Sequence, residues 1–173
     1  HYQFETVHPF LDGNGRIGRM LITLMLLADG ILRRPVLYLS LYLKTNRIEY
    51  YDRLSEVRTK GNYEQWIKFF LHGIIETCDD GIKTIESINS LIKSDEEKLV
   101  KKTETVSKVF DYIKEHPIIS IGGAATALGL SYNGVSSAVK KMVDVGILNE
   151  TTTKARDRVF EYSRYIDILK SGT

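Results

Sequence analysis

Cysteine, proline and excess charge of one sign are all scarce in this sequence. It has one cysteine in 173 residues, three prolines, and a formal net charge of only +2. A single cysteine excludes an intramolecular disulfide and favours a reducing compartment, and we expect Cys78 to be a buried thiol. The nearly balanced charge excludes a strong overall attraction to nucleic acid or to an anionic membrane. Any basic patch must therefore be local.

Long hydrophobic runs are also missing. No apolar run reaches the roughly 20 residues that a helix needs to span a bilayer, and no signal peptide opens the chain. We therefore expect a soluble cytoplasmic protein without a membrane partner. The chain begins at His1 and not at a methionine, so we expect it to be the C-terminal part of a longer protein. A site built from several elements would then be seen here in part.

What the sequence does contain is apolar residues at helical spacing along most of its length, which predicts a mainly α fold. The segments expected to be helical are 16–28, 35–44, 47–58, and a long one from Tyr63 to Ile92. Gly81 and the two aspartates before it are expected to bend or split the long helix. The aromatic residues expected in the core are Tyr50, Tyr51, Trp66, Phe69 and Phe70.

A charged segment divides the chain. Residues 94–103 contain Ser-Asp-Glu-Glu-Lys and a Lys-Lys pair, and they offer little to bury, so we expect a linker there. Residues 1–93 and 104–173 would then be two domains. The second begins with an amphipathic helix through Val106 and Ile113, which ends at His116-Pro117. A short helix over 121–128 follows.

The sequence pattern in the rest of the second domain predicts a winged helix-turn-helix. Ser131 is expected to cap a third helix, and residues 148–152 and 158–162 are expected to form a β-hairpin around 153–157. The side chains expected to meet DNA or a protein partner are Tyr132, Asn133, Ser136, Ser137 and Lys140 of the helix and Lys154, Arg156 and Arg158 of the hairpin. From residue 103 onward, nine Lys and Arg face eight Asp and Glu, so DNA binding and protein docking both stay open.

The most informative stretch is His8-Pro-Phe-Leu-Asp-Gly-Asn-Gly-Arg-Ile-Gly-Arg19, directly before an apolar helix. Its glycines at 13, 15 and 18 satisfy G-x-G-x-x-G, but a dinucleotide loop must follow a strand in a βαβ unit, and no strand is predicted nearby. The Gly-Lys-Ser/Thr of a P-loop is absent. The stretch is therefore neither of these two nucleotide-binding loops.

The chemistry of the same residues still indicates phosphate. Backbone N–H groups around residues 13–15 can form an anion-binding nest, to which the N-terminus of the following helix adds its dipole. Arg16 and Arg19 lie three apart, so both can reach phosphate oxygens from one helix face. Asp12 would hold Mg²⁺, which prefers one or two carboxylates plus phosphates. His8 could accept a proton from a hydroxyl, as histidine does in many catalytic sites.

This stretch resembles, at every specified position, the signature H-x-F-x-[DE]-G-N-G-R-x-x-R of the Fic (filamentation induced by cyclic AMP) family. The resemblance implies that residues 1–93 are the C-terminal part of a helical Fic core, and that the winged helix is an appended domain. It implies a protein adenylyltransferase, which transfers AMP from ATP to a Ser, Thr or Tyr hydroxyl of a target protein. The alternative is a DNA-binding transcriptional regulator whose Fic site only senses or binds nucleotide.

The resemblance also implies a role for each residue of the motif. His8 would be the general base, Asp12 would hold Mg²⁺, and Phe10 would pin the loop into the core. The phosphate ligands would be Asn14, the Gly13 and Gly15 amides, Arg16 and Arg19. The motif recognises phosphates and not the base, so the nucleotide could be UTP instead of ATP. The sequence also leaves open whether the protein forms a homodimer.

Overall fold

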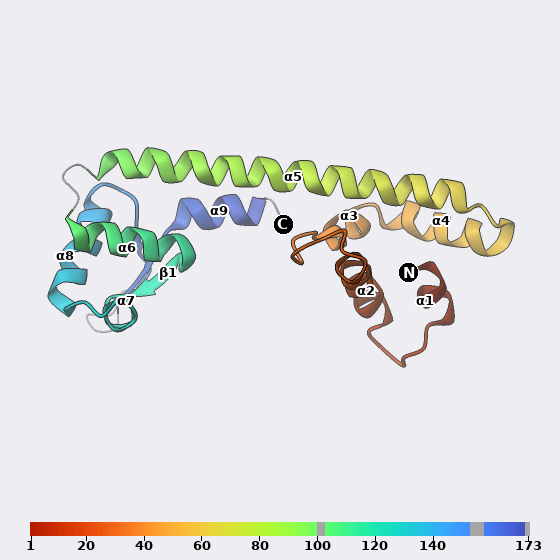
Figure 1. The fold of residues 1–173 in the computed structure, drawn as a ribbon, viewed down its shortest axis with the longest axis horizontal. Coiled ribbons are helices and arrows are strands. Elements are labelled where there is room, and N and C mark those ends of the chain that lie inside the picture. Colours follow the sequence, from red (N-terminus) through yellow and green to blue (C-terminus); the bar gives the residue numbers. More distant parts are fainter. Residues whose placement is uncertain (100–102, 153–157, 172–173) are drawn as a thin grey trace. The chain divides into compact units, whose positions relative to one another are not determined.

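The computed structural model describes residues 1–99, 103–152 and 158–171. Helices dominate it, and three short strands complete it (Figure 1), so the predicted mainly α fold is confirmed. Contacts divide the chain into two compact units, His1–Ile82 and Lys83–Gly172. No described helix is both long enough and apolar enough to cross a membrane.

Unit 1 is built from helices alone in its described part. Its elements are α1 (Tyr2–Val7), α2 (Asn14–Ala28), α3 (Leu39–Thr45), α4 (Arg47–Lys60) and the first part of α5 (Tyr63–Lys98). The buried residues of its core are Ile22, Leu37, Leu39, Tyr42, Leu43, Tyr50, Val57, Trp66 and Phe69. Gly73 of α5 permits the close approach of the Tyr42 ring, whose nearest atoms a Cβ would overlap. This contact fastens α5 to α3.

Helix α5 corrects two predictions. It is continuous through Gly81, which has open space where a Cβ would lie, so that glycine serves no packing purpose. Residues 94–98, predicted to begin a linker, are its last turns. Asp95 is fully buried there, and Leu99 joins the core of unit 2. The linker was predicted because charged side chains were expected to be exposed to solvent. Asp95 can be buried because it has polar partners that satisfy its carboxylate. Residues 100–102 of the predicted linker lie outside the described residues.

Asp95 accepts hydrogen bonds from three side chains. The Lys98 ammonium lies 2.6 Å from its Oδ1, the Tyr162 hydroxyl 2.8 Å from its Oδ2, and the Arg164 Nη2 2.7 Å from its Oδ1. Burial alone would raise the pKa of Asp95, but these donors outweigh it and hold the pKa below its usual value. The network joins the end of α5 to the C-terminal part of unit 2.

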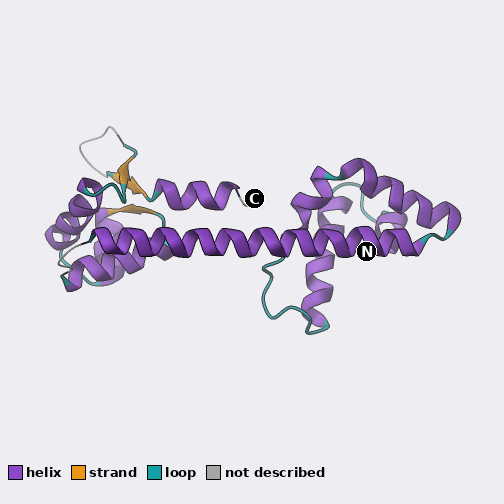
Figure 2. Ribbon diagram, turned by 90° about the horizontal axis from the view of Figure 1, so that it is seen from above, coloured by secondary structure: helices purple, strands orange, loops and turns teal. Residues whose placement is uncertain are grey.

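The remaining elements of unit 2 alternate helices with short strands. They are α6 (Glu104–Glu115), β1 (Ile118–Ser120), α7 (Ile121–Leu128), α8 (Tyr132–Asp144), β2 (Asn149–Glu150), β3 (Val159–Glu161) and α9 (Ser163–Ser171). The strands, orange in Figure 2, form an antiparallel sheet in the order β1-β3-β2. The pairing of β2 with β3 agrees with the predicted hairpin. Strand β1 and helix α9 were not predicted.

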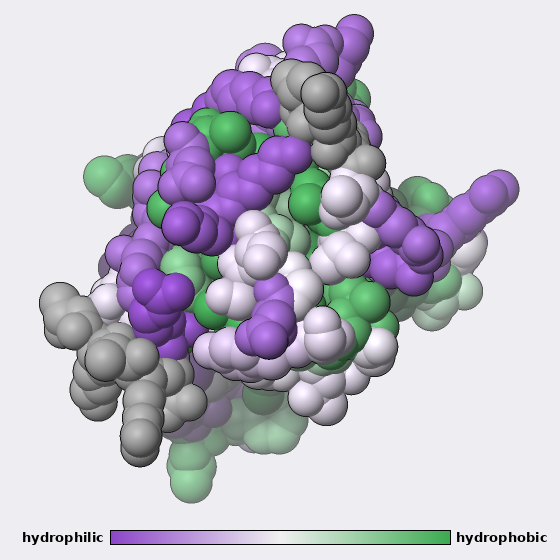
Figure 3. Space-filling view, turned by 90° about the vertical axis from the view of Figure 1, so that its left-hand side faces the viewer, coloured by the Kyte–Doolittle hydropathy of each residue, from purple (hydrophilic) through white to green (hydrophobic). Residues whose placement is uncertain are grey.

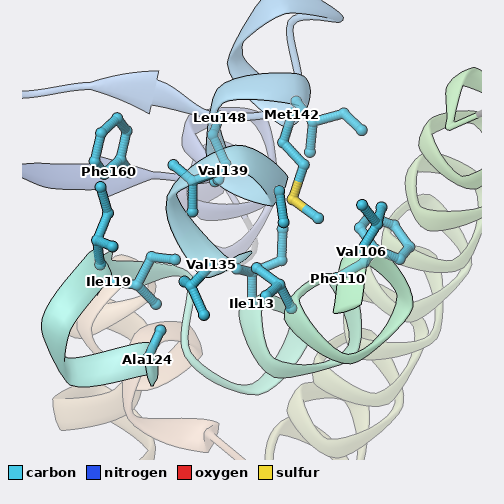
Figure 4. Close-up of a cluster of buried hydrophobic side chains, with 14 of the residues drawn as sticks. Val106, Phe110, Ile113, Ile119, Ala124, Val135, Val139, Met142, Leu148 and Phe160 are labelled. Atoms are coloured by element: carbon cyan, nitrogen blue, oxygen red, sulfur yellow. The ribbon is translucent and has the colours of Figure 1, made fainter. Parts of the chain in front are cut away.

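Helices α6, α7 and α8 enclose one core with the sheet, and the cap at Ser131 was predicted. Thr103, Ser120 and Ser131 each cap a helix by accepting a hydrogen bond from a backbone N–H three residues later. Figure 4 shows the core between α6, α7, α8 and the sheet. The side chains that point toward one another there include Phe110, Ile113, Val135, Val139, Met142, Leu148 and Phe160. Cys78, predicted to be buried, is exposed on α5.

Candidate functional site

The motif forms the loop between α1 and α2 and the first turns of α2. His8 follows α1 in the left-handed conformation (φ 50°, ψ 58°), where its N–H donates to the Phe4 carbonyl oxygen at 3.0 Å. This conformation is uncommon for a residue other than glycine and is often found at functional sites. Pro9 contributes, because the residue before a proline is disfavoured from continuing a helix. The turn leaves the imidazole exposed.

The His8 ring has a defined orientation. Its Nδ1 lies 3.4 Å from the carbonyl oxygen of Glu5, which can only accept a hydrogen bond, so Nδ1 carries the proton in that long contact. The other ring nitrogen, Nε2, is then the position that can accept a proton from a substrate.

Asp12 and Gly13 prepare the start of α2. Gly13 precedes the helix with φ 80°, a conformation that glycine adopts without strain. Its N–H donates to the Asp12 Oδ1 at 2.6 Å. The Asp12 carboxylate is exposed and can turn to a cation, but the Gly13 amide would have to exchange this hydrogen bond to reach a phosphate.

Asn14 has a different place from the one predicted. Only 2% of the residue is exposed. The backbone N–H of Phe10 donates to its Oδ1 at 2.9 Å, and its Nδ2 donates to the Phe10 carbonyl oxygen at 2.6 Å. Both polar side-chain atoms are used on the loop backbone, so in this structure Asn14 shapes the loop and does not face a phosphate. Phe10 itself is 50% exposed and meets Phe4 at a ring distance of 6.2 Å, which does not bury it in the core as predicted.

The remaining glycines of the motif serve two purposes. Gly15 lets the Arg19 side chain fold back along α2, because a Cβ there would lie 3.2 Å from the guanidinium Nη1. Gly18 faces α1, and a Cβ on it would overlap the Glu5 carboxylate. The three glycines thus have three roles: Gly13 turns the loop, Gly15 gives room to the Arg19 side chain, and Gly18 gives room to Glu5 of α1. Arg16, on the first turn, is exposed.

A cavity of about 510 Å³ lies beside the motif. From the motif side, His8 and Gly15 line it, together with Glu5 and Thr6 of α1. The α4 residues that line it are Tyr51, Asp52, Leu54, Ser55 and Arg58. Asp12, Gly13, Asn14, Arg16 and Arg19 are not among its lining residues. The structure therefore brings only part of the predicted phosphate site to this cavity.

Several cavity residues were not predicted from the sequence. Tyr51 was expected in the core, yet it is 52% exposed. Tyr51, Ser55 and Arg58 fall four and three residues apart, so they share one face of α4. That spacing was the available signal, and it distinguishes this face from the buried face of Tyr50 and Val57.

Glu5 brings negative charge to the cavity. Burial raises the pKa of its carboxyl group, while the Arg19 and His8 charges act in the opposite direction. The Glu5 Oε1 is buried and has no hydrogen-bond partner in the described residues. The cavity therefore contains an acid beside the proposed base.

The predicted magnesium site depends on which acidic side chains lie near the motif. No group of three or more His, Cys, Asp or Glu that could hold a metal occurs in the described residues. Mg²⁺ needs only one or two carboxylates when phosphates complete its coordination. An exposed Asp12 carboxylate at a helix start fits that habit, as a ligand shared with a bound nucleotide.

The predicted partner surface of unit 2 lies on α8. Tyr132, Asn133, Ser137 and Lys140 are exposed, and Ser136 is half-buried. In Figure 3 the end of the molecule that carries α6 to α8 shows mainly hydrophilic and near-neutral side chains, with small separate hydrophobic areas.

The predicted hairpin residues are only partly described. Arg158 is exposed but engaged, since it donates to the Glu150 Oε2 at 3.2 Å and lies over the Phe160 ring. Lys154 and Arg156 lie outside the described residues. Of the three cationic contacts predicted in the hairpin, Arg158 alone has a described position, and it already has an acidic partner.

Comparison with known proteins agrees with the motif. The sequence model of the Fic/DOC family matches residues 1–26, which confirms the resemblance for that segment. Protein adenylyltransferase Fic of Aedes aegypti is 34% identical over 79 residues, which are 46% of this chain and 14% of the relative. Protein adenylyltransferase fic-1 of Caenorhabditis elegans is 32% identical over 111 residues, which are 62% of this chain and 20% of the relative. The chain thus spans no more than a fifth of the length of these relatives.

Proposed function

We propose that unit 1 carries the transfer site of a Fic-type protein adenylyltransferase, which moves AMP from ATP to a Ser, Thr or Tyr hydroxyl of a target protein. The motif, the family match over residues 1–26 and the names of the relatives support this proposal. The observation that carries it is the cavity in which His8 and Gly15 meet the exposed face of α4. Its volume lies within the usual range for small-molecule sites, roughly 300–1,000 Å³.

The reaction follows from the position of His8. The target hydroxyl gives its proton to the His8 Nε2, and its oxygen attacks the α-phosphorus of ATP. The bond from the α-phosphorus to the oxygen bridging the β-phosphate breaks, and pyrophosphate leaves with that oxygen. In such a transfer the protein contributes mainly positioning and charge stabilisation. A base that accepts the proton typically adds about 10²–10⁴-fold in rate.

The phosphates would be held at the start of α2. The first N–H groups of a helix lack partners within it, and they and its dipole favour an anion. Arg16 and Arg19 would supply positive charge beside them, and Asp12 would hold Mg²⁺, which neutralises phosphate charge when bound. Asn14 would support this arrangement through the Phe10 backbone, and not by direct contact with the nucleotide.

The first test is the His8→Ala variant of the full-length protein. We expect transfer from labelled ATP to fall by about 10²–10⁴-fold, while ATP binding measured by calorimetry changes by less than about twofold. His72→Ala, an exposed histidine of α5, is the matched control. Transfer by the His8→Ala variant at the wild-type rate would contradict the proposal, and a parallel series with UTP identifies the nucleotide.

A second function is favoured by unit 2. We infer that it is a winged helix-turn-helix domain, supported by its element order α6-β1-α7-α8-β2-β3 and by the exposed polar face of α8. A third helix of this kind reads the major groove in many such domains. A shift assay with duplex DNA should show binding that weakens steeply as salt rises. Binding that is absent at low salt would leave unit 2 as a protein-docking module.

A further inference from the structure

Glu5 is a buried acid to which the proposed reaction assigns no role. It lies on α1 three residues before His8 and lines the same cavity. Its Oε1 is inaccessible to water and has no hydrogen-bond partner among the residues that the structure describes. An unsatisfied buried carboxylate oxygen destabilises a protein, so its retention calls for a reason.

The fold reserves the space for this carboxylate. Gly18 of α2 faces it, and a Cβ at position 18 would overlap the Glu5 Oε1 and come within 3.0 Å of its Cδ. Glycine is unfavourable inside a helix by roughly 0.5–1 kcal/mol relative to alanine. The local sequence thus gives up helix stability in α2 at the position where the acid approaches.

Charges of the motif act on this carboxylate. Burial has the largest effect and raises the pKa of Glu5, while the charges of Arg19, His8 and the N-terminus act in the opposite direction. Arg19 folds back over Gly15, which lines the cavity, and the His8 ring is oriented by the Glu5 backbone carbonyl oxygen. Glu5 therefore contacts the His8 ring through its backbone, and both residues line the same cavity.

We propose that Glu5 is a positioning residue of the transfer site, whose carboxylate stabilises His8 as it becomes positively charged. This inference rests on the proposed function. When His8 accepts the hydroxyl proton, a nearby fixed negative charge favours the resulting imidazolium, as an oriented carboxylate does in other base-catalysed sites. Glu5 itself neither binds the nucleotide nor exchanges the proton.

Glu5→Gln in the full-length protein separates this role from a structural one, because it keeps the shape and removes the charge. We expect kcat for transfer to fall by about tenfold. ATP affinity should stay equal or become tighter, since a negative charge near a triphosphate has been removed. The melting temperature should not fall, because an unsatisfied buried charge is gone. Glu5→Asp, which keeps the charge, should retain kcat within about threefold.

The matched control is Glu64→Gln, an exposed glutamate of α5 paired with Lys68, which should leave kcat unchanged. If the wild-type protein transfers AMP and the Glu5→Gln variant has the same kcat, this inference is overturned and the proposed function is not. A parallel loss of kcat, ATP affinity and melting temperature would also overturn it, because that pattern indicates a purely structural residue. Wild-type protein that transfers no nucleotide would overturn the proposed function and, with it, this role for Glu5.

Discussion

Asn14 illustrates how a polar residue inside a recognised motif can be structural. Its amide replaces a turn of backbone hydrogen bonding, since it satisfies the N–H and the carbonyl of Phe10 at once. These two hydrogen bonds hold the loop, so burial of the Phe10 side chain is not needed to fix it, and that side chain is half-exposed. Rigidity in this loop matters because the groups before and after it, His8 and α2, must keep their spacing.

Asn14→Ala tests this interpretation. Loss of the amide leaves two backbone groups without their partners, so we expect the free energy of unfolding to fall by about 1–3 kcal/mol. Chemical denaturation measures the change, with Asn133→Ala on the exposed face of α8 as the control that should alter it by less than about 0.5 kcal/mol. An Asn14→Ala protein that keeps its stability but loses ATP affinity would instead indicate direct phosphate contact.

At this scale the sequence predicted where the chemistry lies but not how each residue contributes. Spacing alone places His8, Asp12 and the arginines around a helix start. The hydrogen bonds of Asn14 to Phe10 are local, but the motif alone did not separate a residue that shapes the loop from one that faces a phosphate. The burial of Glu5 against Gly18 and the place of Tyr51 at the cavity depend on how α1, α2 and α4 pack, and no local pattern encodes that packing.

Helix α5 contains two glycines with opposite surroundings. A Cβ at Gly73 would overlap the Tyr42 ring, whereas a Cβ at Gly81 meets nothing within 4 Å. The same substitution in one helix should therefore have opposite signs, because alanine favours helix in both but finds space in only one.

We expect Gly81→Ala to stabilise the protein by roughly 0.5–1 kcal/mol and Gly73→Ala to destabilise it by about 1–3 kcal/mol through overpacking. Thermal and chemical denaturation of both variants measure the difference, and each serves as the control for the other. Equal effects at the two positions would show that Tyr42 does not pack on Gly73.

The Asp95 network predicts a pH dependence. The pKa of Asp95 is lowered in the folded state, so its contribution is fully present above the unfolded value, about 3.9, and is lost as pH falls through the folded value. At pH 7 we expect Asp95→Asn to cost on the order of 1–3 kcal/mol, because Lys98, Tyr162 and Arg164 lose an ionised acceptor.

Denaturation of wild type and Asp95→Asn between pH 7 and pH 2 measures this contribution. The stability difference between them should shrink below about pH 4, as the wild-type carboxylate takes up its proton. Asp144→Asn, on an exposed residue of α8, is the matched control. A difference that is constant with pH would mean that the charge of Asp95 contributes nothing.

Among the elements, most helices and the β2–β3 hairpin were predicted, whereas strand β1 and helix α9 were not. An apolar pattern that repeats over ten or more residues can be recognised even when single positions depart from it. This is why α2, α4, α6 and α8 were predicted close to their observed bounds. Strand β1 has three residues and one buried side chain, too few to establish a period of two. The end of α5 was predicted as a linker because a charged side chain in sequence does not reveal the partners that bury it.

The described residues form two separate cores. The buried clusters around Trp66 and around Phe110 share no residue, and each unit has its own core. Cooperative unfolding follows a shared core, so two cores favour two transitions.

We therefore expect calorimetry to resolve two thermal transitions. Trp66→Ala should lower one of them and Val135→Ala the other, each by several degrees, since deletion of a buried side chain costs a few kcal/mol. A single transition that both substitutions lower equally would show that the units unfold together.

The Asn14-Gly15 dipeptide also has a consequence for the chemical ageing of the protein. Asparagine before glycine is prone to losing its amide, because the following backbone nitrogen can attack the side-chain carbonyl with little steric hindrance. Here both polar side-chain atoms are held by Phe10, and the residue is buried at the start of α2. Storage of the folded protein should leave this bond intact, whereas an unfolded preparation would accumulate aspartate at position 14 and lose the amide that holds the loop.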